Sequence, residues 1–319
     1  MACHPNSQMV VHQVEKINGD INHQKFIQDI YPQRKPFLIS GHDLGPCMHK
    51  WNADYLADVG GQQMVKLHVA TQDKMNFITK NFSYKTLPFK EFIRRASATE
   101  NQHYFFQPKE KYYLRSLGND PRKEIANFME QFPALVDDIN LPQYYESSAF
   151  FSSVLRISSG NLQIWTHYDV MDNTLIQITG RKRVVLFSPQ DASNLYLQGD
   201  KSAIVDIDNP DLQKYPKFAS VTRYECVLEP GDILFIPAMW FHNCGALDFS
   251  IGINVFWRHL DCSYYDSRDT YGNKDLLPAA RANQILDRAI KALGELPDDY
   301  KDFYARRLVS KIENLCYLK

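Results

Sequence analysis

The feature that most restricts the fold of this chain is a change of hydrophobic period near Phe150. From there to Trp257, apolar residues alternate with period two in short segments rich in Val, Ile, Leu and Phe, separated by Gly, Pro, Asn and Asp. This pattern is typical of antiparallel strands. The segments are FFSSVLRIS, QIWTHYDV, NTLIQIT, KRVVLFS, YECVLEP, DILFIPA and SIGINVFW. Two facing sheets of a jelly roll accommodate them best, so we expect a mainly β core over residues 150–260.

The segments on either side follow other patterns. Residues 1–149 mix two spacings, which predict helices at 25–31, 51–61, 87–96 and 120–132 and strands at 36–40 and 64–70. In the last of these helices, Asp120 and Pro121 would occupy the cap and the first turn. Residues 261–319 turn helical from Pro278. We therefore expect an N-terminal α/β part packed on the core and a C-terminal helical appendage.

Composition narrows the class of protein. The 319 residues are 44% hydrophobic and carry a formal net charge of -1, so the chain can bury a large core and shows no overall bias toward nucleic acid. Its start lacks the apolar stretch of a signal peptide, and no run approaches the roughly 18 apolar residues of a membrane span. These features predict an intracellular protein without a membrane partner, in the cytoplasm or, as the alternative, in the nucleus.

The cysteines limit the candidate metal ligands. The six of them are widely scattered, with no CxxC pair, at Cys3, Cys47, Cys226, Cys244, Cys262 and Cys316. Such spacing favours free thiols over a disulfide framework or a cysteine-based zinc site. Histidine and carboxylate side chains remain as the candidate ligands.

Two His-x-Asp pairs stand in the chain, His167 with Asp169 and His259 with Asp261. Chance gives about one such pair for 10 histidines and 37 acidic residues in 319 positions, so the pattern carries little weight by itself. The first pair lies in the strand-like run 166–178, where an extended backbone would project both side chains from one face. The second lies beyond the last strand, with no later strand to add a histidine, so we expect it to be structural.

A third ligand for the first pair follows a later strand. In GDILFIPAMWFH, Gly231 and Asp232 form a turn, residues 233–236 a strand that ends at Pro237, and His242 comes next. Two histidines and one carboxylate are the donor set of a facial triad, which leaves three positions on an iron(II) ion open. A bidentate 2-oxo acid can take two of these positions and molecular oxygen the third. A single histidine is more often a core or surface group, whereas this combination favours a metal site.

The runs HYDVMDN, GRKRVVLF, EPGDILFIPAMWFHN and INVFW, within about residues 150–260, resemble the JmjC-domain family of iron(II)- and 2-oxoglutarate-dependent oxygenases. In that family a lysine follows the first histidine at the distance that separates His167 from Lys182, and an asparagine stands near the last Phe-Trp, as Asn254 does in NVFW. Further runs, among them KYYLRSLGNDPRKE, FFSSVLRISS and DFYARR, make nearly the whole chain similar to the branch that hydroxylates wybutosine-type bases in tRNA.

The resemblance implies an enzyme with a double-stranded β-helix that binds Fe(II) through His167, Asp169 and His242 and uses 2-oxoglutarate and molecular oxygen. The far carboxylate of 2-oxoglutarate would lie inside the sandwich, where an unpaired anion is costly. We expect Lys182 to bind it, although its RKR context also fits a solvated lysine.

The resemblance adds three residues to this cosubstrate site. Tyr113 would be a second donor to the far carboxylate, and Asn173 and Asn254 would complete the pocket. Tyr113 could instead belong to the core. Some relatives carry a threonine three residues before the first histidine, where this chain has Ile164, so that contact must be absent or supplied elsewhere.

The implied substrate is the amino-carboxypropyl side chain of the wybutosine precursor, in the anticodon loop of phenylalanine tRNA, and the implied product is hydroxywybutosine. The fold does not fix the substrate, so a protein hydroxylase or histone lysine demethylase is the alternative, and a non-catalytic binding module a second one. Arg156 is a candidate for the substrate channel. Local basic groups could bind tRNA phosphates or could be solvated, at Lys80, Lys85, Arg94, Arg95, Lys109, Lys111, Arg115, Arg122, Lys123, Arg306 and Arg307.

The apolar stripe of the C-terminal helices must be covered, and related hydroxylases pair through such helices. The resemblance therefore implies a homodimer formed by residues 261–319. Packing of the stripe onto the same chain is the alternative.

Overall fold

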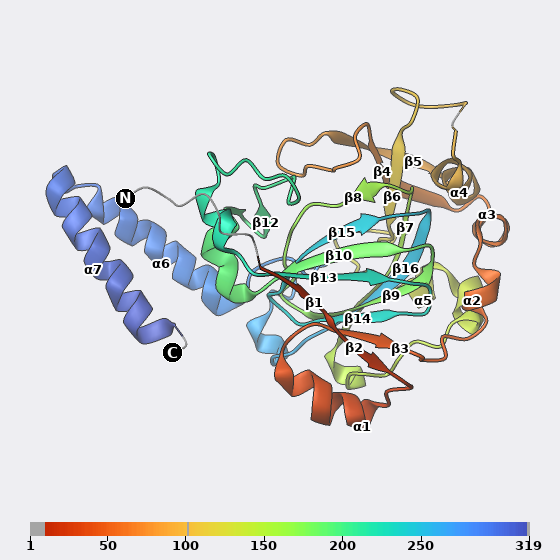
Figure 1. Ribbon diagram of the computed structural model, residues 1–319, viewed down its shortest axis with the longest axis horizontal. Coiled ribbons are helices and arrows are strands. Elements are labelled where there is room, and N and C mark those ends of the chain that lie inside the picture. The colour runs from red at the N-terminus through yellow and green to blue at the C-terminus, as the bar shows by residue number, and fades with distance from the viewer. Residues whose placement is uncertain (1–9, 101, 318–319) are drawn as a thin grey trace. The chain divides into compact units, whose positions relative to one another are not determined.

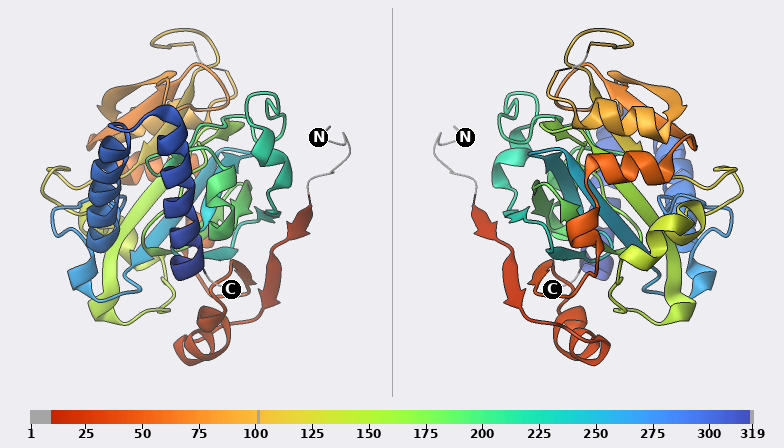
Figure 2. Two further views of the ribbon diagram at one scale, coloured as in Figure 1. Left: turned by 90° about the vertical axis from the view of Figure 1, so that its left-hand side faces the viewer. Right: turned by 90° about the vertical axis from the view of Figure 1, so that its right-hand side faces the viewer.

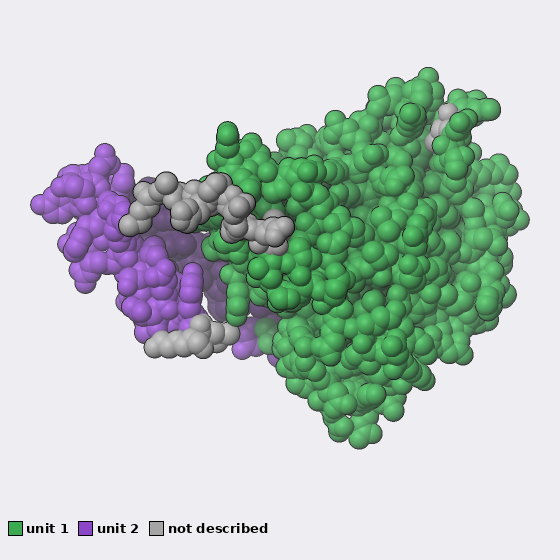
Figure 3. All heavy atoms as spheres, in the orientation of Figure 1, with its two compact units in different colours: residues 1–260, 268–273 green, residues 261–267, 274–319 purple. Residues whose placement is uncertain are grey.

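The computed structural model describes residues 10–100 and 102–317 (Figure 1). The chain divides into two compact units, residues 1–260 with 268–273 and residues 261–267 with 274–319 (Figure 3). The first unit contains two large sheets, and the second contains the C-terminal helices. Within the described ranges, no helix is long and apolar enough to cross a membrane.

The smaller sheet has the strand order β1-β13-β10-β15-β8. Its strands are β1 (Val11–Gln13), β13 (Arg223–Leu228), β10 (Lys182–Phe187), β15 (Phe241–Ala246) and β8 (Leu162–Gln163). The larger sheet has the order β2-β3-β14-β9-β16-β7-β6-β4-β5. Its strands are β2 (Glu15–Asn18), β3 (Phe37–Ser40), β14 (Ile233–Ile236), β9 (Asp172–Thr179), β16 (Ser250–Trp257), β7 (Phe150–Ser158), β6 (Lys111–Arg115), β4 (Met64–Ala70) and β5 (Phe82–Pro88).

The expected mainly β core is confirmed as a jelly roll. The chain crosses between the two sheets from β8 to β9, from β9 to β10, and again at each step from β13 to β16. Strands of the core pair antiparallel within each sheet, which is the arrangement of a double-stranded β-helix. A short hairpin of β11 (Leu197–Gln198) and β12 (Lys201–Ser202) lies in the connection between β10 and β13.

Side chains alternate along a β-strand, so the larger sheet has two faces. Both faces are buried, each in its own hydrophobic core. On β9, Leu175 belongs to the core between the sheets, with Val184 and Leu186 of β10. Its neighbours Ile176 and Ile178 pack in a second core on the other face. That core includes side chains of the helices α3 (Ala53–Gly60) and α4 (Phe89–Ser97). Both helices face the viewer in the right panel of Figure 2.

The N-terminal part is mixed, as expected, and includes the short helices α1 (His23–Lys25) and α2 (Cys47–Lys50). The expected helix at 25–31 instead begins with α1 and continues as a π-helix at Phe26–Ile30. The expected helix at 120–132 is wrong, since α5 spans only Phe128–Gln131 and begins after Asn127. The physical reason is tertiary: the carbonyl of Ala126 accepts the N–H of Ser153 on β7 at 3.1 Å, so it is not used in a helical bond.

The second unit contains two helices, α6 (Leu277–Leu293) and α7 (Asp298–Cys316), with Pro278 in the first turn of α6. Neither helix has a fully buried residue, and large apolar side chains such as Ile285, Phe303 and Leu315 are more than half exposed. Five cysteines are free thiols, at Cys47, Cys226, Cys244, Cys262 and Cys316, and Cys3 lies outside the described residues.

Candidate metal and cosubstrate site

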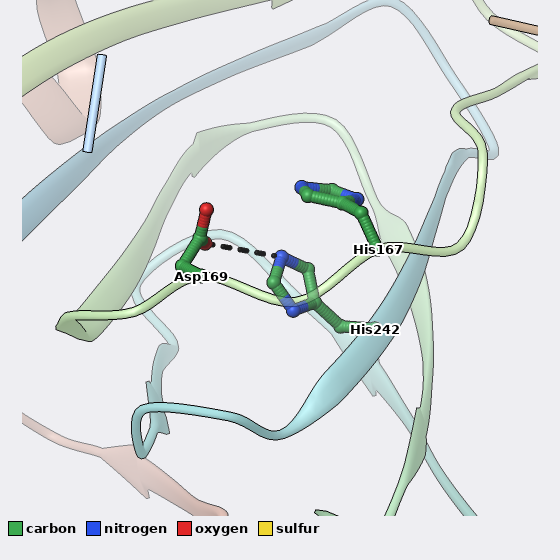
Figure 4. A group of neighbouring side chains, drawn as sticks. All are labelled: His167, Asp169 and His242. Atoms are coloured by element: carbon green, nitrogen blue, oxygen red, sulfur yellow. Dashed lines mark ion pairs between the residues drawn. The ribbon is translucent and has the colours of Figure 1, made fainter. Parts of the chain in front are cut away.

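Three predicted ligands, His167, Asp169 and His242, point toward one another (Figure 4). One ligand atom of each lies within 4.8 Å of those of the other two. Asp169 Oδ2 is 3.5 Å from His242 Nε2, and the two histidine rings have centroids 4.3 Å apart. In the part of the chain that the structure describes, no other group of three His, Cys, Asp or Glu approaches this closely, so His259 and Asp261 do not form one.

The expected extended strand over residues 166–178 is wrong, because β9 begins only at Asp172 and the first two ligands lie in the loop before it. On a flat strand, side chains two residues apart would be separated by about 6.6 Å along the strand. The loop allows Asp169 to turn toward the histidines. Its carbonyl accepts the N–H of Met239 at 2.9 Å, which ties this loop to the segment before β15.

Backbone carbonyls fix which nitrogen of each histidine can bind a metal. The Nδ1 atom of His167 lies 3.0 Å from the carbonyl oxygen of Trp165, and that of His242 lies 3.1 Å from the carbonyl oxygen of Trp240. A carbonyl only accepts hydrogen bonds, so Nδ1 carries the proton and Nε2 keeps a lone pair for a metal. Burial lowers the pKa of both imidazoles, which favours the neutral form that a metal requires.

A cavity of about 40 Å³ adjoins the two histidines and is lined by all four predicted cosubstrate residues, Tyr113, Asn173, Lys182 and Asn254. Lys182, on β10, is 6% exposed. No described carboxylate lies within 4.0 Å of its ammonium group, and burial lowers its pKa to about 8. A buried cation without a counter-ion is costly, so this lysine is suited to bind an anionic ligand.

The other cosubstrate residues leave hydrogen-bonding groups for a ligand. Asn254 Nδ2 donates to Asn173 Oδ1 at 2.9 Å, and the Oδ1 atom of Asn254 is buried without a described partner. The hydroxyl of Tyr113 accepts a hydrogen bond from Arg156 Nη1. Ile164, which stands at the position of the family's threonine, also lines the cavity and offers only apolar contact.

A wider cavity of about 330 Å³ lies against the metal ligands and contains residues that sequence reasoning missed. His167 and Asp169 line it together with Arg115 and Arg156. Charged side chains of Lys66, Asp200 and Lys201 also line it. Much of the remaining wall is aromatic, from His68, Phe77, Tyr84, Tyr113, Trp165, Phe256 and Tyr271. These aromatic residues come from the N-terminal part and from the core and share no sequence signal. The pairing of β6 with β7 joins the sheet of the N-terminal part to the core, and so brings the two groups together.

The predicted basic groups differ in their surroundings. Arg94, Lys80 and Arg122 are exposed. Arg95 is instead part-buried, with its Nε donating to Glu91 at 2.8 Å and its Nη1 to the carbonyl of His103 at 3.0 Å. Arg115 lines the wide cavity. A guanidinium that already binds other groups of the fold is poorly placed to contact a phosphate. The exposed basic residues are therefore the better candidates for tRNA binding.

Behind the site, a buried carboxylate joins three segments of the chain. Asp172 is fully buried and accepts from Arg34 Nη2 at 2.6 Å, from the hydroxyl of Tyr31 at 2.7 Å and from the N–H of Ala238 at 2.8 Å. The last bond holds the residue just before Met239, whose own N–H binds the carbonyl of Asp169. The network thus positions the ligand loop, and no sequence pattern announced it.

Comparison with known proteins agrees with this geometry. Residues 23–262 match the family described as a cupin-like domain. The chain is 56% identical to tRNA wybutosine-synthesizing protein 5 of Homo sapiens, with 96% of this chain and 97% of the relative covered. It is 55% identical to the protein of the same name from Gallus gallus, with 96% of each chain covered.

Proposed function

The chain belongs to the cupin-like domain family, together with tRNA wybutosine-synthesizing protein 5, and on this premise we propose that it hydroxylates the wybutosine precursor in phenylalanine tRNA with Fe(II), 2-oxoglutarate and molecular oxygen. It is an enzyme, a tRNA hydroxylase of the cupin oxygenase type. One observation carries the detailed proposal: a His-Asp-His group lies against a cavity that is also lined by the buried Lys182, which has no described carboxylate within 4.0 Å of its ammonium group.

The donor set supports iron as the metal. Two imidazole nitrogens and one carboxylate oxygen suit a divalent first-row metal, and three ligands leave positions open for a cosubstrate. When bound, iron and 2-oxoglutarate would supply the oxidising chemistry that inserts one oxygen atom of O2 into a C–H bond. The residues of the chain hold these groups in place and exclude water from them.

Lys182 would bind the far carboxylate of 2-oxoglutarate, because its ammonium is buried and has no described counter-ion within 4.0 Å. The low dielectric of the cavity strengthens such a pair. Tyr113 would donate its hydroxyl proton to the same carboxylate. Asn173 and Asn254 would complete the pocket, and their mutual hydrogen bond fixes the orientation of the two amide groups.

The substrate in this proposal is the anticodon loop of phenylalanine tRNA, and its product is hydroxywybutosine. The exposed basic residues Arg94, Arg122 and Lys123 are candidates for phosphate contacts. The slightly negative overall charge of -1 does not oppose this, since phosphates respond to the local surface that they approach.

We also propose a homodimer that pairs through α6 and α7. Twelve large apolar side chains between Ile285 and Tyr317 are exposed among the described residues of this unit. An apolar surface of this kind is costly in water and is usually covered by a partner.

The decisive experiment is mass spectrometry of tRNA nucleosides. Purified protein is incubated with Fe(II), 2-oxoglutarate, O2 and phenylalanine tRNA that carries the unhydroxylated precursor, and the modified nucleoside should gain one oxygen atom. Asp169→Ala is the matched inactive control. Hydroxylation of a peptide, or demethylation of a histone lysine, in place of the tRNA reaction would contradict the substrate assignment.

A further inference from the structure

Two arginines of the wide cavity face each other across neighbouring strands. In the antiparallel pairing of β6 with β7, Arg115 is directly opposite Arg156. Like charges in this arrangement repel and destabilise a sheet. Arg115 also ends β6, the strand that carries Tyr113, and Arg156 lies within β7. The pair therefore has a cost that an anion between or beside the two guanidinium groups would relieve.

Neither guanidinium has its hydrogen-bonding capacity filled. Arg115 Nη1 and Arg156 Nε are buried and have no described hydrogen-bond partner. Arg115 Nη2 donates to the carbonyl of Tyr271 at 3.3 Å, and Arg156 Nη1 donates to the hydroxyl of Tyr113. No described carboxylate lies within 4.0 Å of either group. Unsatisfied buried donors of this kind indicate a place for an acceptor.

The charge balance of the cavity points to an anionic ligand. Asp169 is the carboxylate whose charge both arginines feel, and in the proposed function its charge is engaged by the metal. Burial and the neighbouring Arg156 lower the pKa of Arg115 to about 10, so the group stays charged near neutral pH. Of the other charged residues that line the cavity, Lys201 pairs with Asp200 at 2.5 Å, and Lys66 adds a further cation. The cavity thus has an excess of positive charge beside the position where the reaction takes place.

The rest of the cavity suits an aromatic ligand. Tyr84 is 49% exposed, while Trp165 stacks on Phe82 with ring centroids 5.7 Å apart and lies 5.0 Å from Phe77. Flat aromatic surfaces stack nucleobases regardless of hydrogen-bond pattern. A ligand with a planar base at one end and a negative group at the other would therefore contact both parts of the lining.

We propose that Arg115, together with Arg156, binds the carboxylate of the substrate's amino-carboxypropyl side chain and so directs the adjacent carbons toward the metal group. This inference rests on the proposed function, in which that side chain is the part hydroxylated. Guanidinium groups match the geometry of a carboxylate through paired hydrogen bonds. Arg115 and Arg156 are thus positioning and specificity residues in this proposal.

The test compares two anticodon stem-loop RNAs that differ only in this carboxylate. One carries the free acid and the other its methyl ester. Charged hydrogen bonds of about 1.5 to 3 kcal/mol correspond to a preference for the acid of roughly 10- to 100-fold in kcat/KM. The same preference should be seen in binding of the two RNAs to metal-free protein, measured by fluorescence anisotropy, which does not depend on turnover.

Arg115→Gln should reduce this preference to less than about 3-fold, mainly because kcat/KM and affinity for the free-acid RNA fall. Arg288→Gln, which removes an exposed arginine of α6, is the matched control and should keep the preference. The wild-type comparison needs no variant, so it decides the question even if Arg115→Gln folds poorly.

The possible failures are distinguishable. If wild-type protein hydroxylates and binds both RNAs equally, the carboxylate contact is wrong while the proposed function stands. An equal loss for both RNAs in Arg115→Gln points to a backbone phosphate as the bound anion and also overturns the inference. If neither RNA is hydroxylated, the proposed function itself fails, and the inference fails with it.

Discussion

His167 and His242 form a closed backbone pair, in which the N–H of each donates to the carbonyl of the other, at 3.1 and 2.8 Å. The pair joins a loop before β9 to strand β15 of the opposite sheet. Because the bridge is made by the main chain, it sets the distance between the two rings independently of what the rings bind. Removing one imidazole should therefore leave the bridge in place.

This relationship leads to the first prediction. His167→Ala, Asp169→Ala and His242→Ala should each abolish iron binding and turnover, with a change in the free energy of unfolding of about 1 kcal/mol or less in the metal-free protein. Metal analysis and thermal unfolding measure the two effects. His259→Ala is the control and should retain iron. If it loses as much metal as His167→Ala, the choice between the two His-x-Asp pairs is wrong.

Replacing Lys182 should separate stability from function. Lys182→Met removes a buried charge without a described counter-ion, so the metal-free protein should become more stable by about 1 kcal/mol or more. The KM for 2-oxoglutarate should rise roughly 10- to 100-fold, as expected for loss of a charged hydrogen bond.

The pH dependence of this stability difference has a defined sign. Burial lowers the pKa of Lys182 from 10.5 to about 8, so between these values the unfolded chain binds more protons than the folded one. Stability then rises with pH across this window, and the cost of burying the ammonium is fully present below pH 8. In urea unfolding, the free energy of unfolding of the wild-type protein should rise relative to that of Lys182→Met from pH 8 to 10.5. If the difference between the two free energies of unfolding does not change with pH, Lys182 is not a buried, charged lysine.

The buried ion pair of Arg34 with Asp172 should contribute far more to the free energy of unfolding than a surface ion pair does. Arg34→Met leaves the fully buried carboxylate of Asp172 without its cation, which should cost about 3 to 5 kcal/mol. Lys35→Met is a matched control, since Lys35 pairs with the exposed Glu15 at 2.8 Å, and should cost less than about 1 kcal/mol. Denaturant unfolding of both variants tests this, and similar losses would remove the special role of Asp172.

The full chain should sediment as a homodimer at micromolar concentration. Ile290 and Phe303 are 57% and 56% exposed, and the double variant Ile290→Glu with Phe303→Glu would place charges in the covered surface and should shift the protein to monomer. Analytical ultracentrifugation measures the mass of both proteins. A wild-type monomer at every concentration excludes this role for α6 and α7.

Binding of tRNA should weaken with salt and with charge reversal at exposed residues. Arg94→Glu together with Arg122→Glu should reduce affinity at all salt concentrations and lower the slope of log K against log salt by about one for each lost phosphate contact. Decarboxylation of 2-oxoglutarate without tRNA should be unchanged. Arg95 is excluded from this test, because its bonds to Glu91 and His103 make it part of the fold. Salt-independent binding would argue against a phosphate-contacting surface.

The sequence by itself determined the mainly β core and the types of ligand at the site. Period-two alternation follows from the geometry of a single strand, so segments such as 150–158 and 250–257 could be located without knowledge of their partners. Likewise, the chemistry of His167, Asp169, His242 and Lys182 is a property of the side chains themselves, and resemblance to a family added their expected roles.

Only the tertiary structure decided where these groups meet. The bridge between His167 and His242, the opposition of Arg115 and Arg156, and the burial of Asp172 all join segments that are distant in sequence. Such contacts depend on strand register and sheet order, which local periodicity does not encode. The physical reason is that a hydrogen bond or ion pair forms when two groups are close in space, and topology, more than composition, determines which groups become neighbours.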